Sequence, residues 1–328
     1  MPIQIALIGL GRLGGSIGMA LGAQNGLQIA GFDRDPDAMR VAQSRGAVHR
    51  TEWNLINAVE GADLVLLALP LAEQRDILAA LAPSLRDGCV VASVAPLLSP
   101  PIAWANELVP AGRFFAAAHP ILNPAQLHTG DAGLNAARAD LFARGLWAIA
   151  PAPACAPEAL KLVGDLAMLL GASPYFIDPA EHDGLMGGVD ALPALLALAL
   201  MQAATASPGW KEMRKLADRG FATATTPLAD AERAPLTLNR DSALRYLDAA
   251  IAALQSLREK IAAGHETALD ELLAEAASLR AKWLTDRQRG DWDQLEKPPL
   301  EMPSAREVLS RMLFGGLMPR KREQKKDQ

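Results

Sequence analysis

Short apolar runs recur through the first 150 residues, separated by segments whose apolar residues follow helical spacing. Each run is apolar throughout instead of alternating with polar residues, which is typical of strands that helices cover on both faces of a parallel sheet. The runs read IQIALIGL, LQIAGFD, ADLVLLALP, GCVVASVAP, FFAAAHP and LWAIAP. This pattern predicts an α/β domain of the Rossmann type with a doubly wound parallel sheet.

Beyond about residue 155 the strand pattern gives way to helical spacing. We expect a helix within 154–172, a short strand at YFID (175–178), and two long amphipathic helices within 241–284 that break near Gly264. The last residues turn polar and end in the basic run PRKREQKKDQ, which is typical of a disordered tail. The expected parts are a Rossmann-type domain at 1–152, an all-α helical domain at 153–285 and a tail with a basic end at 286–328.

Composition narrows the class of partner. The chain has 328 residues, half of them hydrophobic, and this allows two domains with cores of their own. A net charge of -5 gives no positive field for nucleic acid or an anionic membrane, so the expected partner is a small molecule. Asp190 and Pro193 interrupt the longest apolar stretch, which argues against a membrane span. Cys89 and Cys155 lack the paired spacing of metal or disulfide sites, and we expect a reducing, cytoplasmic setting.

A glycine-rich loop follows the first apolar run. Gly9, Gly11 and Gly14 have the G-x-G-x-x-G spacing, which allows a tight turn, a close approach of backbone to a pyrophosphate, and close packing of the next helix. Asp33 ends the second run, and an acid there binds a ribose 2′-hydroxyl, which favours NAD. The adjacent Arg34 leaves NADP open, because it could pair with a 2′-phosphate. The predicted cofactor-binding residues are Gly9, Gly11, Arg12, Leu13, Gly14, Asp33, Arg34 and Pro70.

The histidines are the candidates for proton transfer. His119 ends the run FFAAAHP, where a strand of an α/β sheet meets its ligand, and the alternative is a hydrogen-bonded loop histidine. His182 lies between Glu181 and Asp183 just before a helix, so a helix-capping network is the alternative to a substrate contact. His128 lies nine residues after His119, in a loop that could border the same cleft.

With these residues in place, the chain resembles the prephenate and arogenate dehydrogenase family of tyrosine biosynthesis, from residue 3 to about 284. The resemblance rests on GLGRLGGSIG, GFDRD, GADLVLLALPL, AAAHPILN, DPAEHDGLMGGVDALPALLALAL and LNRDSALRYLDAAIAALQSLREKI. It implies NAD(P)-dependent oxidative decarboxylation of a cyclohexadienol, with His119 as the catalytic base. It also implies a homodimer built by the C-terminal helices.

The chain departs from the family pattern on the substrate side. Asp190 stands where the family has the serine of its Ser-His-Leu-Pro-His helix, and both histidines of that helix are alanine. Prephenate has two carboxylates, which require cations or aligned donors, and Asp190 would repel them. The remaining departures are Pro96 for a serine, Leu98 for a lysine, Ala191 and Ala194 for the two histidines, and Ala222 and Thr226 for arginines.

Three functions therefore stay open. The first is an NAD-dependent oxidoreductase of this family, in which Asp190 would meet the ammonium group that arogenate carries in place of a keto group. Asp190, His128 and His182 are its candidate substrate contacts. The second is an NAD(H)-binding protein without hydride chemistry, and the third is a dehydrogenase acting on a different small hydroxy acid.

Overall fold

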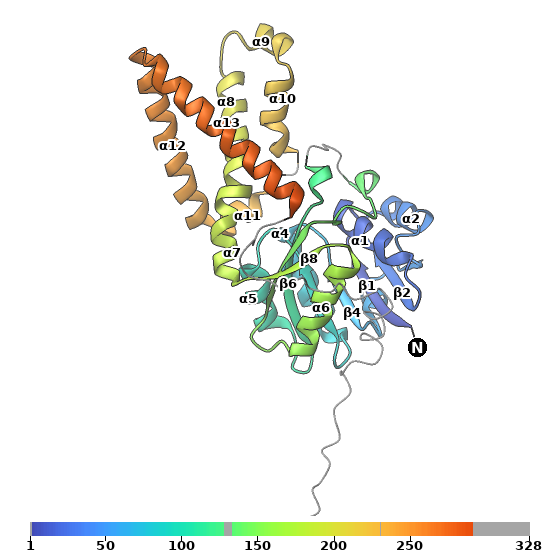
Figure 1. The fold of residues 1–328 in the computed structure, drawn as a ribbon. Helices are drawn as coiled ribbons and strands as arrows, with labels where there is room; N and C mark the ends of the chain where they lie inside the picture. The colour runs from blue at the N-terminus through green and yellow to red at the C-terminus, as the bar shows by residue number, and fades with distance from the viewer. Residues whose placement is uncertain (1, 128–132, 230, 291–328) are drawn as a thin grey trace, which may run out of the picture.

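The computed structural model describes residues 2–127, 133–229 and 231–290. Its first part is one sheet of eight strands in the order β3-β2-β1-β4-β5-β6-β7-β8 (Figure 1). Every neighbouring pair is parallel except β6 and β7, which are antiparallel. The mostly parallel order confirms the predicted Rossmann-type fold class. The strands are β1 (Ile3–Ile8), β2 (Leu27–Phe32), β3 (Arg50–Thr51), β4 (Leu64–Leu67), β5 (Val90–Val94), β6 (Phe114–Ile121), β7 (Leu146–Pro151) and β8 (Ser173–Phe176).

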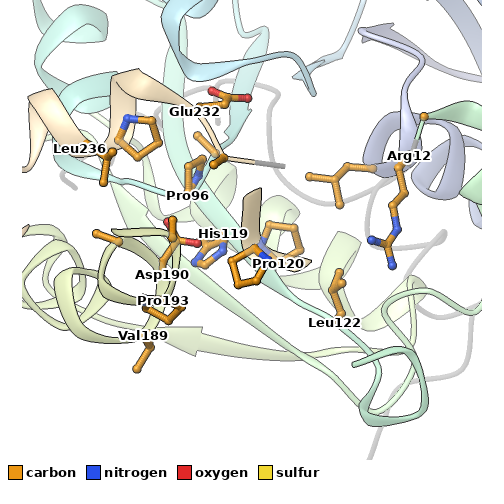
Figure 2. A pocket seen from close by; sticks show the side chains of 18 residues that line it. Arg12, Pro96, His119, Pro120, Leu122, Val189, Asp190, Pro193, Glu232 and Leu236 are labelled. Atoms are coloured by element: carbon orange, nitrogen blue, oxygen red, sulfur yellow. The ribbon is translucent and has the colours of Figure 1, made fainter. Parts of the chain in front are cut away.

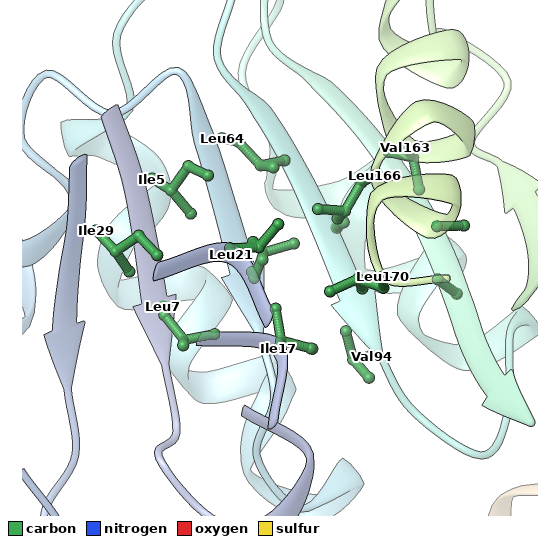
Figure 3. Packing of buried hydrophobic residues seen from close by; sticks show 14 of the residues in the cluster. Ile5, Leu7, Ile17, Leu21, Ile29, Leu64, Val94, Val163, Leu166 and Leu170 are labelled. Carbon is green, nitrogen blue, oxygen red and sulfur yellow. The ribbon is translucent and has the colours of Figure 1, made fainter. Parts of the chain in front are cut away.

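Helices cover both faces of the sheet, which explains why its central strands are apolar throughout. On one face, Ile5 and Leu7 of β1 pack with Ile17 of the first helix and Leu166 of the sixth (Figure 3). On the other face, alternate residues of the same strands pack with Leu78 and its neighbours. A strand with two covered faces buries every side chain. These helices are α1 (Arg12–Gly22), α2 (Pro36–Ser44), α3 (Leu55–Val59), α4 (Leu71–Leu81), α5 (Ser99–Leu108) and α6 (Pro157–Leu169).

The sheet continues beyond residue 152, where the sequence pattern placed the end of this domain. β8 pairs with β7 in parallel, and α6 connects the two strands. Val163 and Leu166 on α6 belong to the same core cluster as β1 and α1. The α/β part of the chain therefore extends to Phe176, because α6 and β8 bury their apolar residues against the sheet.

The second part of the chain is helical. It begins with a continuous helical run of 27 residues from Pro179 to Thr205, in which a π-helical turn, η4 (Gly187–Ala191), interrupts the α-helical hydrogen bonding. Pro193 lacks the N–H that would bond the carbonyl four residues earlier, and Leu192 N donates to Gly187 O in the wider pattern. The elements are α7 (Pro179–Met186), α8 (Leu192–Thr205), α9 (Trp210–Leu216), α10 (Arg219–Thr225), α11 (Arg233–Leu238), α12 (Arg240–Ala262) and α13 (Glu266–Arg289).

The two long helices predicted within 241–284 are present as α12 and α13, and Gly264 separates them with a φ of 67°. α12 stands away from the sheet beside α8, and α13 runs back until its end contacts the sheet domain, where Arg287 donates to the carbonyl of Leu122 (Figure 1). α13 continues to Arg289, past the expected domain end at residue 285, and the tail from residue 291 lies outside the described residues.

Helices α8, α12 and α13 carry apolar side chains that face solvent in the single chain. The run Pro179–Thr205 is long and apolar enough to cross a membrane by composition, with a mean hydropathy of 1.8 over its best window and 22% of that window buried. Its first turns are nevertheless tied to the sheet domain, since His182 and Asp183 are buried there. The exposed apolar residues include Leu196, Leu198, Leu200, Ile251, Leu254, Leu257, Ile261, Leu272, Leu273, Leu279 and Trp283.

Candidate active site

The glycine-rich loop has the shape of a phosphate-binding turn. Gly9 has a φ of 93°, and a Cβ atom there would lie 2.4 Å from the carbonyl oxygen of Ala68. A Cβ atom on Gly14 would lie 1.9 Å from Gly9 O, so the helix start and the strand end can meet only as glycines. Gly11 instead faces open space, with nothing within 4 Å of a Cβ built on it, directly before α1. The loop therefore offers the N-terminus of α1 to a ligand, as dinucleotide phosphates require.

Asp33 and Arg34 border a second cavity beside this loop. The Asp33 carboxylate accepts hydrogen bonds from Leu10 N (2.7 Å) and Asp35 N (2.9 Å), which fixes it against the loop. Arg34 Nη1 lies 3.0 Å from Glu73 Oε1 in an exposed salt bridge. The cavity has a volume of about 320 Å³. Its lining includes the predicted cofactor residues Gly9, Gly11, Asp33, Arg34 and Pro70.

A pocket of about 550 Å³ lies between the sheet domain and the helical domain. Arg12 and Leu13 of the phosphate loop line one part of it, and His119 of β6 and Asp190 of the π-helical turn line another (Figure 2). The predicted catalytic histidine and the predicted phosphate loop therefore share one pocket. His128 lies outside the described residues.

His182 lies behind His119 and does not line this pocket. The two imidazole rings meet edge to face, with His119 Nδ1 3.1 Å from His182 Nε2. His182 Nδ1 lies 2.9 Å from Asp183 Oδ1. His182 and Asp183 are 5% and 7% exposed, so the row Asp183–His182–His119 runs from the protein interior to the pocket.

Asp183 also joins the two domains. Its carboxylate accepts hydrogen bonds from Leu98 N (2.8 Å) and Ser99 N (2.9 Å), at the start of α5. The expectation that His182 lies just before a helix whose first N–H groups the adjacent carboxylates cap is wrong, because Glu181, His182 and Asp183 lie inside α7. Asp183 instead caps a different helix, α5. Helix α7 itself is capped by Asp178, whose carboxylate accepts from Ala180 N and Glu181 N.

Burial shifts the pKa of His119. Loss of solvent, with a smaller contribution from the nearby His182, lowers it from 6.5 to about 3. His119 is therefore a neutral imidazole at physiological pH, which is the form that can accept a proton. Sequence reasoning placed His119 at the end of its strand but gave no sign that His182 lies against it.

The pocket beyond His119 is apolar and acidic. Asp190 and Glu232 contribute carboxylates, and Arg12 is the single lysine or arginine among its described lining residues. Burial raises the pKa of Asp190 against an opposing effect of His182, although the side chain keeps access to solvent. Arg214 and Arg219, which could have replaced the missing arginines, do not line the pocket.

Four of the substituted family positions line the pocket, namely Pro96, Asp190, Ala191 and Ala194, whereas Leu98, Ala222 and Thr226 do not. Glu232 was not anticipated, since no motif surrounds it in the sequence. The pocket thus lacks the donors that the family pattern supplies at 96, 191 and 194. Its polar groups near His119 are carboxylates instead.

Comparison with known proteins supports both halves of this description. Residues 17–175 match the family model described as prephenate dehydrogenase, nucleotide-binding domain. Residues 178–275 match prephenate dehydrogenase, dimerization domain. The matches adjoin near the end of β8, where the sheet ends in the structure.

Curated relatives carry related names at modest identity. The chain is 25% identical over 205 residues to prephenate dehydrogenase of Bacillus subtilis, covering 61% of this chain and 53% of that protein. It is 28% identical over 254 residues to the probable prephenate dehydrogenase NovF of Streptomyces niveus, covering 72% and 66%. Cyclohexadienyl dehydrogenase of Zymomonas mobilis is 24% identical over 289 residues, covering 86% and 97%. The alignment thus spans less than two thirds of the first two relatives.

Solved structures share the fold. Arogenate dehydrogenase of Synechocystis superposes with a TM-score of 0.67 at 24% identity, covering 86% of this chain and all of that one. Prephenate dehydrogenase of Aquifex aeolicus, in complex with hydroxyphenyl propionate and NAD⁺, gives a TM-score of 0.75 at 21% identity, covering 86% and 98%. The two domain models together match most of the chain in the order that the fold displays, and the protein belongs to the prephenate dehydrogenase family.

Proposed function

We propose that the protein is an NAD-dependent dehydrogenase that oxidises and decarboxylates a cyclohexadienol, a step of tyrosine biosynthesis. The observation that carries this proposal is the shared pocket, in which His119 faces the same space as Arg12 and Leu13 of the phosphate loop. A proton acceptor and a nucleotide site that share one pocket are what a hydride-transferring enzyme needs. The names of the curated relatives support the same reaction class.

The residues around the glycine-rich loop fit NAD in preference to NADP. The open face of Gly11 and the N-terminus of α1 would hold the pyrophosphate, and the Asp33 carboxylate would accept from the ribose hydroxyls. A 2′-phosphate would meet both Asp33 and Glu73, while Arg34 is already paired with Glu73. When bound, NAD⁺ accepts the hydride that leaves the substrate.

The residues of the chain supply the base and a pocket lined largely by apolar side chains. His119, held neutral by burial, accepts the proton of the ring hydroxyl while hydride leaves the ring carbon that bears this hydroxyl. The carboxylate then departs as carbon dioxide, its bonding electrons complete the aromatic ring, and the product oxygen regains a proton. Proline side chains line several sides of the pocket and add no hydrogen-bond donors.

The carboxylates of the pocket favour arogenate over prephenate. Asp190 and Glu232 would attract the ammonium group of arogenate, whereas prephenate presents a second anionic side chain to them. Both carboxylates are exposed, so water screens them and each pairs with an ammonium group for up to about 1 kcal/mol, or about fivefold in binding. The charge of the pocket therefore favours arogenate by a small factor for each carboxylate.

The exposed apolar faces of α8, α12 and α13 support a homodimer through the helical domain. A surface of this kind is unusual on a monomer and common in obligate dimer interfaces. We place the enzyme in the cytoplasm, where the free thiols of Cys89 and Cys155 stay reduced.

The test is a paired assay of the purified full-length protein with prephenate and with arogenate, following NADH formation. We expect turnover of both to require His119, with arogenate the faster substrate. His265→Ala serves as a control, because His265 is exposed in the turn between α12 and α13. No NADH from either substrate, together with calorimetric binding of NAD⁺, would favour a non-catalytic NAD(H)-binding protein. Faster turnover of prephenate would refute the substrate assignment alone.

A further inference from the structure

The row of side chains behind His119 starts from a carboxylate that only accepts hydrogen bonds. The Asp183 carboxylate accepts hydrogen bonds from Leu98 N and Ser99 N, which can only donate, and it lies at hydrogen-bonding distance from His182 Nδ1. Burial alone would raise the pKa of Asp183, but these hydrogen bonds lower it below its ordinary value. Asp183 is therefore an anion at every physiological pH, with its lone pairs directed at donors.

An ionised Asp183 fixes the protons on both rings in turn. His182 must donate from Nδ1 to the carboxylate, so the neutral ring has its lone pair on Nε2. That lone pair accepts from His119 Nδ1, which must then carry a hydrogen. The remaining lone pair of His119 is on Nε2, and His119 is the one ring of the two that lines the pocket.

We propose that His182 and Asp183 are positioning residues that act through His119. They hold its ring with an unprotonated Nε2, and His182 takes over a proton from Nδ1 when Nε2 removes one from the substrate. This inference rests on the proposed function, since it requires a substrate hydroxyl at His119. It assigns a role to two buried residues that do not touch the pocket.

Each bond to hydrogen that breaks in this proton transfer is matched by one that forms. The substrate O–H bond breaks as His119 Nε2–H forms, and His119 Nδ1–H breaks as His182 Nε2–H forms. NAD⁺, when bound, would take the hydride with its electron pair, so both rings change protons only. The positive charge ends on His182, 2.9 Å from the Asp183 carboxylate, instead of on His119, whose pKa burial lowers to about 3.

The charged groups around His182 favour this transfer. Asp183 on α7 touches His182, and Asp190 on the π-helical turn attracts it from the pocket side. His119 on β6 contacts the Nε2 side of the same ring.

The decisive variant is His182→Gln, because a glutamine oxygen can still accept from His119 Nδ1 but cannot take up a proton. We expect kcat to fall about 100-fold, within the range that a positioned base contributes, with KM nearly unchanged. The acid limb of the pH profile should also move to lower pH, because protonation then falls on His119 alone. His265→Gln is the matched control and should leave both quantities unchanged. Wild-type kcat in His182→Gln, or a fall in kcat with an unmoved pH profile, would overturn the proposal.

A second measurement uses neither substrate nor cofactor. Nitrogen-15 spectra of histidine-labelled protein report which ring nitrogen carries the hydrogen, and signals that vanish in His119→Asn and His182→Gln assign the two rings. We expect both in the Nδ1–H form at neutral pH, although free histidine prefers Nε2–H. An Nε2–H signal from His119 would overturn the proposal even in an active enzyme. An inactive enzyme with both rings in the Nδ1–H form would instead count against the proposed function.

Discussion

Replacing Asp183 by asparagine tests how strongly the helical domain is fastened to the sheet domain. The wild-type carboxylate accepts three hydrogen bonds. Its Oδ1 accepts from Leu98 N and His182 Nδ1, and its Oδ2 accepts from Ser99 N. In Asp183→Asn one oxygen remains, and the new amide group turns its hydrogens toward one of these donors. A buried donor left without an acceptor costs about 1–3 kcal/mol. Because hydrogen bonds to a carboxylate are about twice as strong as neutral ones, we expect a total loss of about 2–4 kcal/mol.

The pH dependence gives this prediction a second signature. The pKa of Asp183 is lowered in the folded protein, so its stabilisation is fully present above the unfolded value of 3.8 and is lost as pH falls through the folded value. The difference between wild type and Asp183→Asn should therefore be constant near neutral pH and shrink below about pH 4.

Urea unfolding at fixed protein concentration measures both effects, since concentration matters for a dimer. Asp178→Asn is the matched control: Asp178 also caps a helix, and asparagine caps as well as aspartate. A loss below about 0.5 kcal/mol in Asp183→Asn, the usual scatter of neutral surface changes, would refute the reasoning. So would a loss that does not diminish in acid.

Three further predictions follow from the site and the helical domain. Gly11→Leu should weaken NAD⁺ binding at least about tenfold by calorimetry, because the leucine side chain enters open space that the pyrophosphate would occupy, and it should leave the unfolding midpoint unchanged. Wild-type affinity for NAD⁺ in this variant would contradict the proposed phosphate site. Asp190→Asn should lower KM for prephenate and raise it for arogenate, and an equal change in both would show that the charge does not select. Gly187→Ala should destabilise the helical domain by about 1–3 kcal/mol in thermal unfolding, since its Cβ would lie 2.8 Å from Ser242 Cβ and 2.9 Å from Ser242 O.

Much of the fold could be predicted because its central strands are buried on both faces. A run such as ADLVLLALP contains β4, in which all four residues are buried, and the run itself reveals this. Edge strands left weaker signals. β3 is only Arg50–Thr51, and β8 is mostly exposed, so the first was missed and the second did not mark the domain boundary. Residues that make few buried contacts leave little hydrophobic pattern to detect.

The site also contains features that the sequence predicts and features that it does not. The places of the glycine-rich loop and of His119 in the fold could be predicted because each depends on local sequence near the end of a strand. The contacts of Asp183 with His182 and α5 could not be, because Leu98 lies 85 residues away in sequence. The π-helical turn was also missed, since Pro193 alone does not distinguish a kink, a helix start and a wider turn. Long-range pairing of polar groups follows from the packed tertiary structure and has no periodic signature.

The cap on α5 carries an evolutionary consequence. Asp183 recognises the main chain of Leu98 and Ser99, and every residue except proline supplies the same N–H there. Selection for these two hydrogen bonds therefore does not by itself constrain the side chains at 98 and 99. Other positions of the ASVAPLL segment are less free, because Ala95 and Leu97 are buried and pack in one cluster with Ala234 of the helical domain. Pro96 is only half-buried and lines the pocket, so it is the position of this segment where exchange for a relative's residue can change substrate preference while the two domains keep their attachment.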